Sequence, residues 1–594
     1  MLPVFLKCRT RRKDGKTHRS WSIVESRRYP GGKVAHHHVL YLGELSDSQQ
    51  HSWQRTLEVI DERTGEPRQL ALFPTGEAPE RKAGAAPALQ VRLAGLRLSR
   101  PRQWGACWLG DLLWRTLGLD RFFAERLERT REGTDWEQVL RVLVLYRLIS
   151  PGSEWRLHRH WFDTTALADL LQTDARVAQD DTLYRGHDHL LPHKEALFGH
   201  LRERWADLFG ARYEVLLYDL TSTYFECDVP ESPQDPRRFG YSRDRRSDCV
   251  QVVVALVVTP EGLPLAYEML PGNTADKTTL GAMLERVHKR HGAAQRIWVM
   301  DRGIPTEEVL EQMRTASVPV HYLVGTPKGR LSRLEAQLTE RPWVQVRGQL
   351  RVKSLPQDGE TYVYTESGDR VHKERSMRRR ALKKYWRRLG ELMALKEPVR
   401  DEVLIKLGQA REQAGRQAAA LVQVQVDAQG RLSRELDRGK LRQVRRREGR
   451  YLLRTNLPDT TPDTLWRYYM QLSAVEESFR TLKGDLGLRP VYHQKPERIE
   501  AHLFVAFLAY CLTTTLRQQL RCVAAGLTPR AVLEKMGTVM LLDVGLPTTD
   551  GRELKLVRRT VPGPEVQVLL AQLGLTLPDE PPPRLSAEQS AEVV

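Results

Sequence analysis

The stretch RIWVMDRGIPT, residues 296–306, runs from an apolar segment directly into Asp301 and then into a helix-like pattern. An apolar strand followed by a turn and a helix is typical of an α/β sheet. The run VLLYD leads into Asp219 in the same way. Because open α/β sheets collect ligands at the carboxyl ends of their strands, we expect both aspartates at one sheet edge. Either one alone could also cap a turn or a helix start.

Strands and helices alternate around these two runs, from residue 213 to residue 328. CVQVVVALVV and LPLAYEML are predicted to form a hairpin through the turn TPEG. The following segment predicts a capped helix that starts at Asn273 or Thr274. We interpret Asn273 and Asp276 as structural residues of that turn and helix start.

The pattern divides the chain into six predicted regions. Residues 1–90 contain a hairpin with a Gly-Gly loop, 91–205 are helical and predicted to bind DNA, and 206–330 form the first part of an α/β core. Residues 331–455 form a basic inserted α+β subdomain, 456–525 complete the core, and 526–594 form a C-terminal region with a disordered Pro-rich tail.

The composition points to a nucleic-acid partner. The chain of 594 residues has a formal net charge of +18 and a pI near 9.7. Solubility alone requires a net charge of only a few elementary units. A polyanionic partner explains a net positive charge as large as this one. A chain of this length is also too long to fold around a single hydrophobic core, so we expect several domains.

The cysteines and apolar runs indicate a protein of the cytoplasm. Six cysteines lie far apart and form no Cys/His spacing typical of zinc fingers, which predicts a reducing compartment and no structural zinc. The N-terminus has too short an apolar run for a signal peptide. The longest apolar run, residues 501–512, is shorter than a membrane helix needs, so we expect no membrane partner.

A basic run marks the predicted insertion. In Lys373–Arg388, nine of sixteen residues are Lys or Arg. Such a run can be a solvated helix face, but its like charges repel one another without a counter-ion, which favours contact with phosphate. A second basic run, Gly439–Arg450, has the same two interpretations. The predicted DNA contacts in the first run are Arg378, Arg379, Arg380, Lys383 and Lys384.

A long helix predicted over Thr464–Gly487 supplies a third acidic residue. Tyr469, Glu476 and Lys483 are spaced by seven residues and share one helix face, which Arg480 joins. An apolar stripe from Leu472 to Leu486 lies to one side of that face, and Glu477 points toward water. The geometry therefore selects Glu476 over Glu477. An ordinary ion pair between Glu476 and Arg480 is the alternative interpretation.

These segments together resemble a DDE (Asp-Asp-Glu) transposase. The resemblance rests on YDLTSTYFE, LPLAYEMLPGNTADKTTL, VMDRGI and the Tyr469-to-Lys483 helix followed by LRPVYHQKPERIEAHLFVAFLAY. The chain is most similar to the bacterial insertion-sequence-four-like group, in its insertion-sequence-1634 branch, over about residues 100 to 525. Leu472 departs from the pattern, which often has Arg between the Tyr and the Glu.

The resemblance implies a fold and a reaction. The fold is a ribonuclease-H-like mixed sheet core with helices on both faces, interrupted between Asp301 and Glu476 by the insertion. The activity is metal-dependent cleavage of DNA at the terminal inverted repeats of an insertion sequence, followed by joining of the 3′ ends to target DNA. Asp219, Asp301 and Glu476 become the catalytic metal ligands, with Asp219 as the bridge between the ions.

The chemistry of the site and its partners follows from these roles. Oxygen ligands suit two Mg²⁺ ions, or Mn²⁺ as a substitute, better than zinc. By resemblance Tyr469 and Lys483 hold the DNA near the scissile phosphate. Arg480 is a further predicted DNA contact, and Arg302 is either a phosphate contact or a partner for Asp301.

We expect a homodimer on DNA because two DNA ends are joined in one event. We also expect the protein to be associated with the bacterial nucleoid. Two other functions fit the sequence: a domesticated, non-catalytic DNA-binding protein, and a nuclease without strand transfer. An intact triad argues against the first, because drift could erase carboxylates that no longer bind metal. The second differs only in the joining step.

Overall fold

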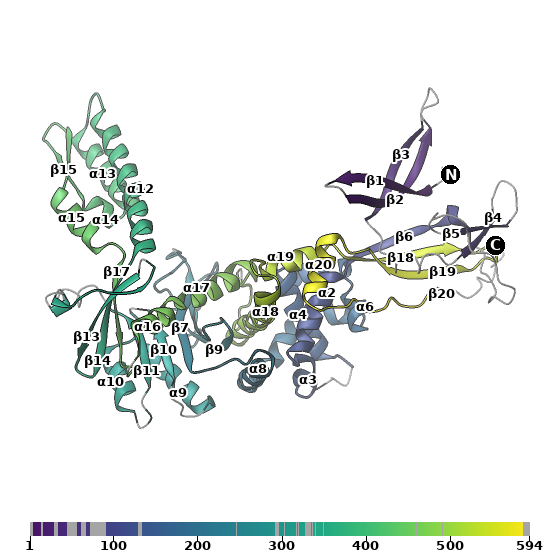
Figure 1. Cartoon of the computed structure of the whole chain (residues 1–594), viewed down its shortest axis with the longest axis horizontal. Helices are drawn as coiled ribbons and strands as arrows, with labels where there is room; N and C mark the ends of the chain where they lie inside the picture. The colour runs from purple at the N-terminus through teal and green to yellow at the C-terminus, as the bar shows by residue number, and fades with distance from the viewer. Residues whose placement is uncertain are drawn as a thin grey trace.

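The structure is a computed structural model of the whole chain. It describes the backbone of residues 4–13, 16–28, 34–43, 56–60 and 67–71, and residues 91–585 except 129–132, 245, 292–295, 302, 317, 319, 327–333, 335–336, 339, 349, 459 and 490. The body is elongated, with a helical arm at one end (Figure 1).

The described residues form one large mixed sheet. Its strands, in spatial order, are β12 (Val344–Arg347), β13 (Leu350–Gln357), β14 (Glu360–Ser367), β17 (Arg450–Thr455), β11 (His321–Gly325), β10 (Ile297–Met300), β7 (Val215–Phe225), β8 (Val250–Val258) and β9 (Pro264–Pro271). β10 is parallel to β7 and β11, and all other neighbours are antiparallel. The predicted hairpin through TPEG is confirmed as β8–β9.

Helices cover both faces of this sheet. Alternate residues of β7 point to opposite faces, so its apolar side chains pack into two separate cores. Leu216 and Tyr218 pack with α9 (Leu280–His291) and α10 (Glu307–Thr315). Leu217 belongs to the larger core on the other face, which includes α18 (Pro496–Val523). The predicted helix start at Asn273 or Thr274 is wrong: a short 3₁₀ turn, Asp276–Thr278, precedes α9.

The buried apolar helix α18 is longer than the predicted apolar run. It is the one described helix long and apolar enough to cross a membrane, judged by length and composition alone. Within its most apolar window, 94% of the residues are buried inside the protein. Its apolar side chains therefore serve as core.

Helices also fill the segment from residue 105 to residue 209. They are α2 (Gly105–Thr116), α3 (Leu119–Ala124), α4 (Trp136–Ile149), α5 (Glu154–Arg156), α6 (Leu167–Leu171), α7 (Asp180–Gly186) and α8 (Lys194–Phe209), with short 3₁₀ turns and one π-helical turn, Leu157–Trp161, between them. Their apolar residues join the same core as α18, so this segment packs directly on the sheet-bearing part. Trp205 of α8 donates to Thr515 Oγ1 of α18 at 3.1 Å across that contact.

The segment predicted as an insertion divides into two structural parts. Its ends are β12, β13, β14 and β17, which extend the large sheet instead of forming a separate unit. Its middle forms the arm in Figure 1: α12 (Gly368–Met393), α13 (Arg400–Ala414), α14 (Arg416–Ala419), the hairpin β15 (Val422–Val426) and β16 (Leu432–Leu436), and α15 (Arg438–Arg447). The arm has its own small core, which includes Tyr385, Leu389 and Leu407.

The C-terminal region pairs with the start of the helical segment. After α19 (Pro529–Met536), strands β18 (Met540–Pro547), β19 (Glu553–Arg559) and β20 (Arg584–Leu585) form a sheet with β6 (Arg97–Gln103), and α20 (Pro564–Gln572) lies between β19 and β20 in sequence. The predicted disordered tail thus begins with a short strand, and residues 586–594 lie outside the described residues.

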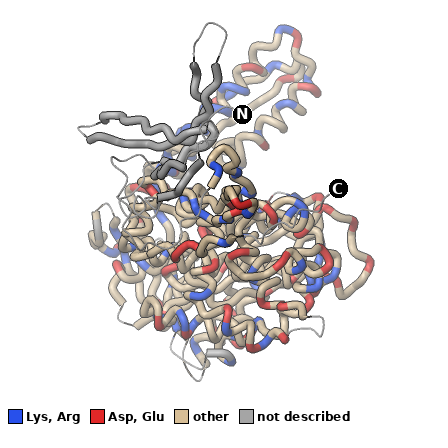
Figure 2. The backbone as a smooth tube through the Cα atoms, turned by 90° about the vertical axis from the view of Figure 1, so that its right-hand side faces the viewer, with Lys and Arg blue, Asp and Glu red and all other residues tan. Residues whose placement is uncertain are grey.

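The N-terminal strands are β1 (Val4–Lys13), β2 (Lys16–Arg28) and β3 (Val34–Gly43), followed by the pair β4 (Thr56–Ile60) and β5 (Pro67–Ala71). β2 pairs with β3 in antiparallel order, which confirms the predicted hairpin, although its Gly-Gly loop lies outside the described residues. Over the body of the chain, acidic and basic positions are interspersed (Figure 2).

Candidate active site

Two adjacent parallel strands bring the predicted aspartates together. Met300 of β10 pairs with Tyr218 of β7, so the next residues, Asp301 and Asp219, follow at the same level of neighbouring strands. Parallel strands lie about 4.8 Å apart. β7 does not end at Asp219, as the sequence suggested, but continues to Phe225 while paired with β8 alone. Asp219 therefore stands where the sheet opens between β7 and β10.

The carboxylate of Asp219 is held against the backbone and lies close to other charged groups. The backbone N–H of Leu220 donates to Asp219 Oδ1 at 2.8 Å. Burial, helped by the charges of Asp301 and Glu476, raises the pKa of Asp219 to about 6, while the Leu220 hydrogen bond and Arg243 act against the rise. Charge effects of this kind act over a short range, so the three predicted carboxylates share one electrostatic environment.

Glu476 reaches this environment from α17 (Leu472–Arg480), which packs against β7. Within the described part of the chain no cation pairs with Glu476. Its neighbour Glu477 instead lies near Arg480, at 3.9 Å, and Arg517, at 3.6 Å. The sequence assigned Arg480 to Glu476 as the alternative ion pair, and that assignment is wrong. The helix thus presents one carboxylate to the aspartates and ties the other to arginines.

The helix predicted over Thr464–Gly487 is divided by its hydrogen bonding. α16 (Pro462–Met470) ends at Gln471, α17 follows, and Thr481–Asp485 form a π-helical turn. The apolar stripe is buried as expected, and Leu472, where Arg is often found, packs against the core. Tyr469 stacks on Tyr451 of β17, with ring centroids 5.7 Å apart.

Lys483 is held by an acidic residue that the sequence did not single out. Its Nζ lies 3.1 Å from both carboxylate oxygens of Asp244, which Arg489 also approaches at 3.2 Å. The Lys483 side chain is only 13% exposed, and burial lowers its pKa. Lys483 therefore lies in a half-buried ion cluster next to the helix that carries Glu476.

Arg243 is the cation that the sequence missed at this site. It lowers the pKa of Asp219, and its Nη2 lies 2.6 Å from Asp276 Oδ1. Its backbone N–H donates to Ser222 Oγ of β7 at 3.3 Å, which fixes the loop over the strand. Asp276 is thus an ion-pair partner within the site. No local pattern marks Arg243 in YSRDRRSD, because its role depends on a contact across the chain.

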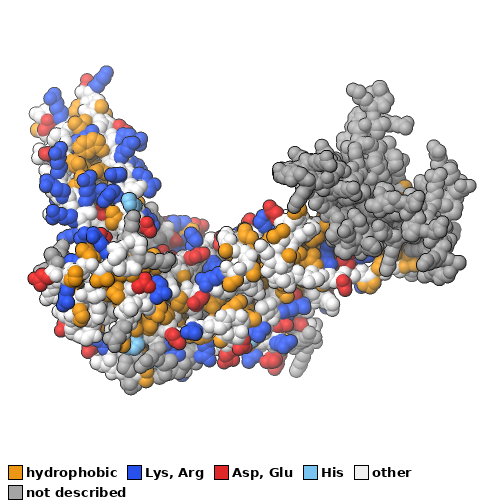
Figure 3. All heavy atoms as spheres, viewed as in Figure 1, with side chains coloured by type: hydrophobic (Ala, Val, Ile, Leu, Met, Phe, Trp, Pro, Cys, Tyr) orange, Lys and Arg blue, Asp and Glu red, His pale blue; other side chains and the backbone are white. Residues whose placement is uncertain are grey.

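The basic residues of α12 differ in exposure. Arg378 is buried against Glu448, with which it forms an ion pair, and burial lowers its pKa. Arg379, Arg380, Lys383 and Lys384 line an open groove of about 690 Å³ with Trp386 and Leu436. Lys and Arg side chains crowd the arm around a hydrophobic patch in Figure 3. Arg378 therefore supports the arm, while its neighbours face outward.

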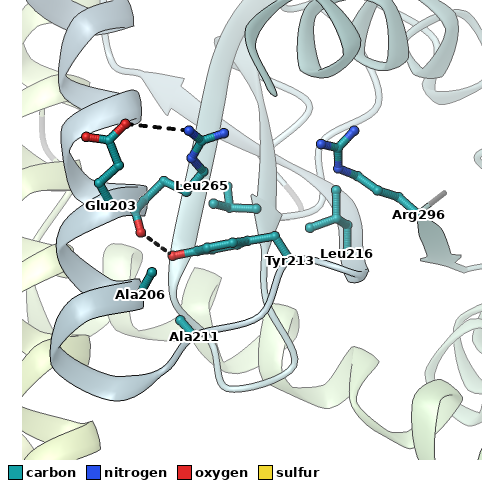
Figure 4. Close-up of a pocket in the computed structure, with 8 residues that line it drawn as sticks. Glu203, Ala206, Ala211, Tyr213, Leu216, Leu265 and Arg296 are labelled. Carbon is teal, nitrogen blue, oxygen red and sulfur yellow. Dashed lines mark hydrogen bonds and ion pairs between the residues drawn. The ribbon is translucent and has the colours of Figure 1, made fainter. Parts of the chain in front are cut away.

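Arg302 lies outside the described residues, so its predicted phosphate contact stays a prediction. A pocket of about 340 Å³ is formed by Tyr213, Leu216, Arg296 and residues of α8 (Figure 4), where Tyr213 donates its hydroxyl to the Arg202 carbonyl at 2.7 Å. It lies at the amino ends of β7 and β10, at the opposite edge from the carboxylates.

Comparison with known proteins gives two family matches. Residues 224–512 match the transposase DDE domain, a range that begins just after Asp219 and contains Asp301 and Glu476. Residues 6–70 match the N-terminal domain of the IS1634 family of transposases. No curated protein matches the sequence.

Among solved structures, a piggyBac transposase synaptic complex with hairpin DNA, determined by cryo-electron microscopy, aligns with a TM-score of 0.33 and 9% identity. The alignment covers 73% of this chain and 78% of that one.

Proposed function

The chain belongs to the IS1634-type DDE transposases, and we propose that it cleaves DNA at the terminal inverted repeats of its insertion sequence and joins the 3′ ends to target DNA. One observation carries this proposal. Asp219, Asp301 and Glu476, separated by long stretches of chain, meet closely enough for two of them to raise the pKa of the third. Such crowding of carboxylates is costly unless a cation neutralises it.

The three carboxylates fit divalent cations of the Mg²⁺ or Mn²⁺ type. Carboxylate oxygens are the ligands these ions prefer, and the gathering of three carboxylates around Asp219 supports binding there. We propose that Asp219, Asp301 and Glu476 would hold two such ions. When bound, the ions would activate the attacking oxygen and stabilise the leaving 3′ oxygen.

The surrounding fold is proposed to be a ribonuclease-H-like core. The meander β7–β8–β9, with β10 and β11 parallel to β7, supports this proposal, as do the helices on both faces. Division of the chain at residues 90, 205, 330, 455 and 525 remains a proposal. The arm, and not the whole of residues 331–455, is the part that stands apart from the sheet.

The remaining residues of the site are proposed to hold DNA. Arg243 neutralises part of the charge around Asp219. Lys483, fixed by Asp244, and Tyr469 lie on the same helical segment as Glu476 and would contact the strand near the scissile phosphate. Arg480 is exposed and would contact DNA farther out, with the outward residues of α12. Binding as a homodimer would bring two transposon ends together.

Replacement of Asp301 by Asn tests this function. Loss of a metal ligand that contributes several kcal/mol lowers the rate of Mg²⁺-dependent cleavage of a terminal-repeat duplex by about 10³-fold or more. Binding of the duplex, measured by fluorescence anisotropy, stays nearly unchanged. Glu308→Gln, an exposed residue of α10, is the matched control and keeps full cleavage. Undiminished nicking by Asp301→Asn contradicts the assignment.

Two other functions remain to be separated by experiment. A domesticated, non-catalytic protein would bind the duplex and never cut it. A nuclease without strand transfer would cut but not join. A strand-transfer assay with a pre-cleaved 3′ end and a supercoiled target distinguishes them, and joined product is the expected result.

A further inference from the structure

A second group of titratable side chains lies in the core between the helical segment and α18. Its members, each at most 4% exposed, are Glu154 of α5, His187 of the 3₁₀ turn His187–His189, His493 of the loop before α18, and His502 of α18. The proposed transposase chemistry uses none of them.

Ring nitrogens of all three histidines approach one carboxylate oxygen. Glu154 Oε1 lies 3.3 Å from His187 Nε2, 3.3 Å from His493 Nε2 and 3.8 Å from His502 Nδ1. The ligand atoms of Glu154, His187 and His493 all lie within 4.8 Å of one another. Four polar groups from separate segments thus converge on one buried point.

Hydrogen bonding alone does not account for this arrangement. Good N–H···O bonds measure about 2.9 Å. Of the three approaches to Glu154, only the one from His187 forms a hydrogen bond, and it is long, at 3.3 Å. His493 Nε2 and His502 Nδ1 are buried and have no hydrogen-bond partner within the described part of the chain. Buried polar atoms without partners are rare, and here they point toward a shared centre.

A hydrogen bond to the backbone sets the tautomer of His502. Its Nε2 lies 3.2 Å from the carbonyl oxygen of Leu488, so Nε2 carries the proton and donates it. A neutral imidazole then presents a bare lone pair at Nδ1, which faces the carboxylate of Glu154. Two electron-rich atoms repel each other unless a cation lies between them. Donation of the outer N–H to a backbone carbonyl is also typical of histidines that ligate metals.

The spacing fits a metal of the zinc class. Tetrahedral coordination with bonds of about 2.0–2.1 Å places neighbouring ligand atoms about 3.3 Å apart. The two shortest approaches to Glu154 Oε1 have this value, while His502 stands farther out and would supply the third nitrogen. Imidazole and carboxylate together suit Zn²⁺ better than Mg²⁺.

We infer that Glu154, His187, His493 and His502 form a closed structural site for one zinc-class divalent cation. The site joins two segments of the helical region to the loop and helix that follow the Glu476 helix. The sequence predicted no structural zinc because its cysteines and histidines show no local zinc-finger spacing. Here the ligands come from segments far apart in the chain, and only His493 and His502 are near neighbours.

Metal content of the full-length protein tests the inference. Protein washed with EDTA and desalted is analysed by inductively coupled plasma mass spectrometry, and about one zinc per chain is expected. X-ray absorption of the wild type is expected to show a shell of nitrogen and oxygen without sulfur. Absence of zinc from folded wild type, with no uptake of Zn²⁺ or Co²⁺ and no change in Tm on their addition, overturns the inference.

Two variants at one position separate a ligand from a packing residue. His493→Asn is expected to lose most of the zinc, whereas His493→Cys retains a ligand and, loaded with Co²⁺, gains a thiolate charge-transfer band. His160→Asn, at an exposed histidine of the same region, is the control and keeps wild-type content. A Co²⁺ spectrum of His493→Cys identical to that of wild type overturns the assignment. DNA cleavage is not measured in either experiment, so the outcome is independent of the proposed function.

Discussion

Tyr218 and Met300 are the last residues through which β7 and β10 pair, and the next residue on each side is an aspartate. The main chain of two parallel strands thereby brings Asp219 and Asp301 to one level of the sheet. Glu476 is delivered by a helix packed on β7. The site is therefore only as rigid as the sheet and the helix that carry it, and its electrostatics are open to measurement.

Metal-free protein is expected to lose stability as pH rises through the range of about 4 to 6. The folded-state pKa of Asp219, about 6, lies above its ordinary value of 3.8, so the folded state binds this proton more tightly. The stabilisation is complete below about pH 4 and is lost as the carboxyl ionises. Chemical denaturation in a chelator across this range measures it. Asp219→Asn removes this component of the pH dependence, and an unchanged slope in that variant contradicts the pKa shift.

Glu476 and Glu477 are expected to respond oppositely to replacement by Gln. Glu476→Gln removes a proposed metal ligand and lowers cleavage by about 10³-fold or more. Glu477→Gln loses only exposed pairing with Arg480 and Arg517, so cleavage changes little. Initial rates of single-strand nicking at saturating Mg²⁺ measure both. A larger loss of cleavage in Glu477→Gln than in Glu476→Gln would show that Glu477, and not Glu476, is the metal ligand.

Lys483 and Asp244 are expected to be energetically coupled. Their side chains are 13% and 16% exposed, so loss of one leaves the other half-buried with an incomplete set of partners. Because Arg489 also pairs with Asp244, the coupling should be moderate, about 1–2 kcal/mol. A double-mutant cycle of Lys483→Met and Asp244→Asn, followed by urea unfolding, measures it. Additive effects would mean that the two side chains do not interact in solution.

The outward basic residues of α12 are expected to contribute to DNA affinity through phosphate contacts. Replacement of Arg379, Arg380, Lys383 and Lys384 by Gln should reduce the slope of log affinity against log salt concentration by about 3–4. Binding titrations at several salt concentrations measure the slope. The double variant Arg411→Gln and Arg416→Gln, exposed on the same arm but outside the groove, is the control. An equal change in both variants would indicate general charge and not a binding face.

Local patterns predicted the parts of this protein whose physics is local. The apolar runs before Asp219 and Asp301 form parallel strands, and helical periodicity separated Glu476 from Glu477, which the electrostatics of Asp219 support. The core helix α18 and the hairpin β8–β9 also follow from periodicity and turn residues.

Features that depend on distant contacts escaped the sequence. β7 continues beyond Asp219 because β8 supplies its partner there, and nothing in VLLYD signals that. β13 and β14 belong to the large sheet because β17 returns beside β14 after the arm. Arg243, Asp244 and the histidines around Glu154 acquire their roles from segments elsewhere in the chain, so no spacing rule identifies them.

The arm leaves the sheet and returns to it at the same place. The backbone N–H of Ser367, the last residue of β14, donates to the carbonyl of Gly449, just before β17, at 3.0 Å. The residues between them therefore form an inserted segment whose two ends are hydrogen-bonded to each other. Evolution could lengthen, shorten or exchange such a segment without changing the pairing of any strand of the sheet. The distance over which the arm could contact DNA could then change among relatives without any change in the proposed catalytic site, because the sheet holds the carboxylates in place whatever the length of the arm.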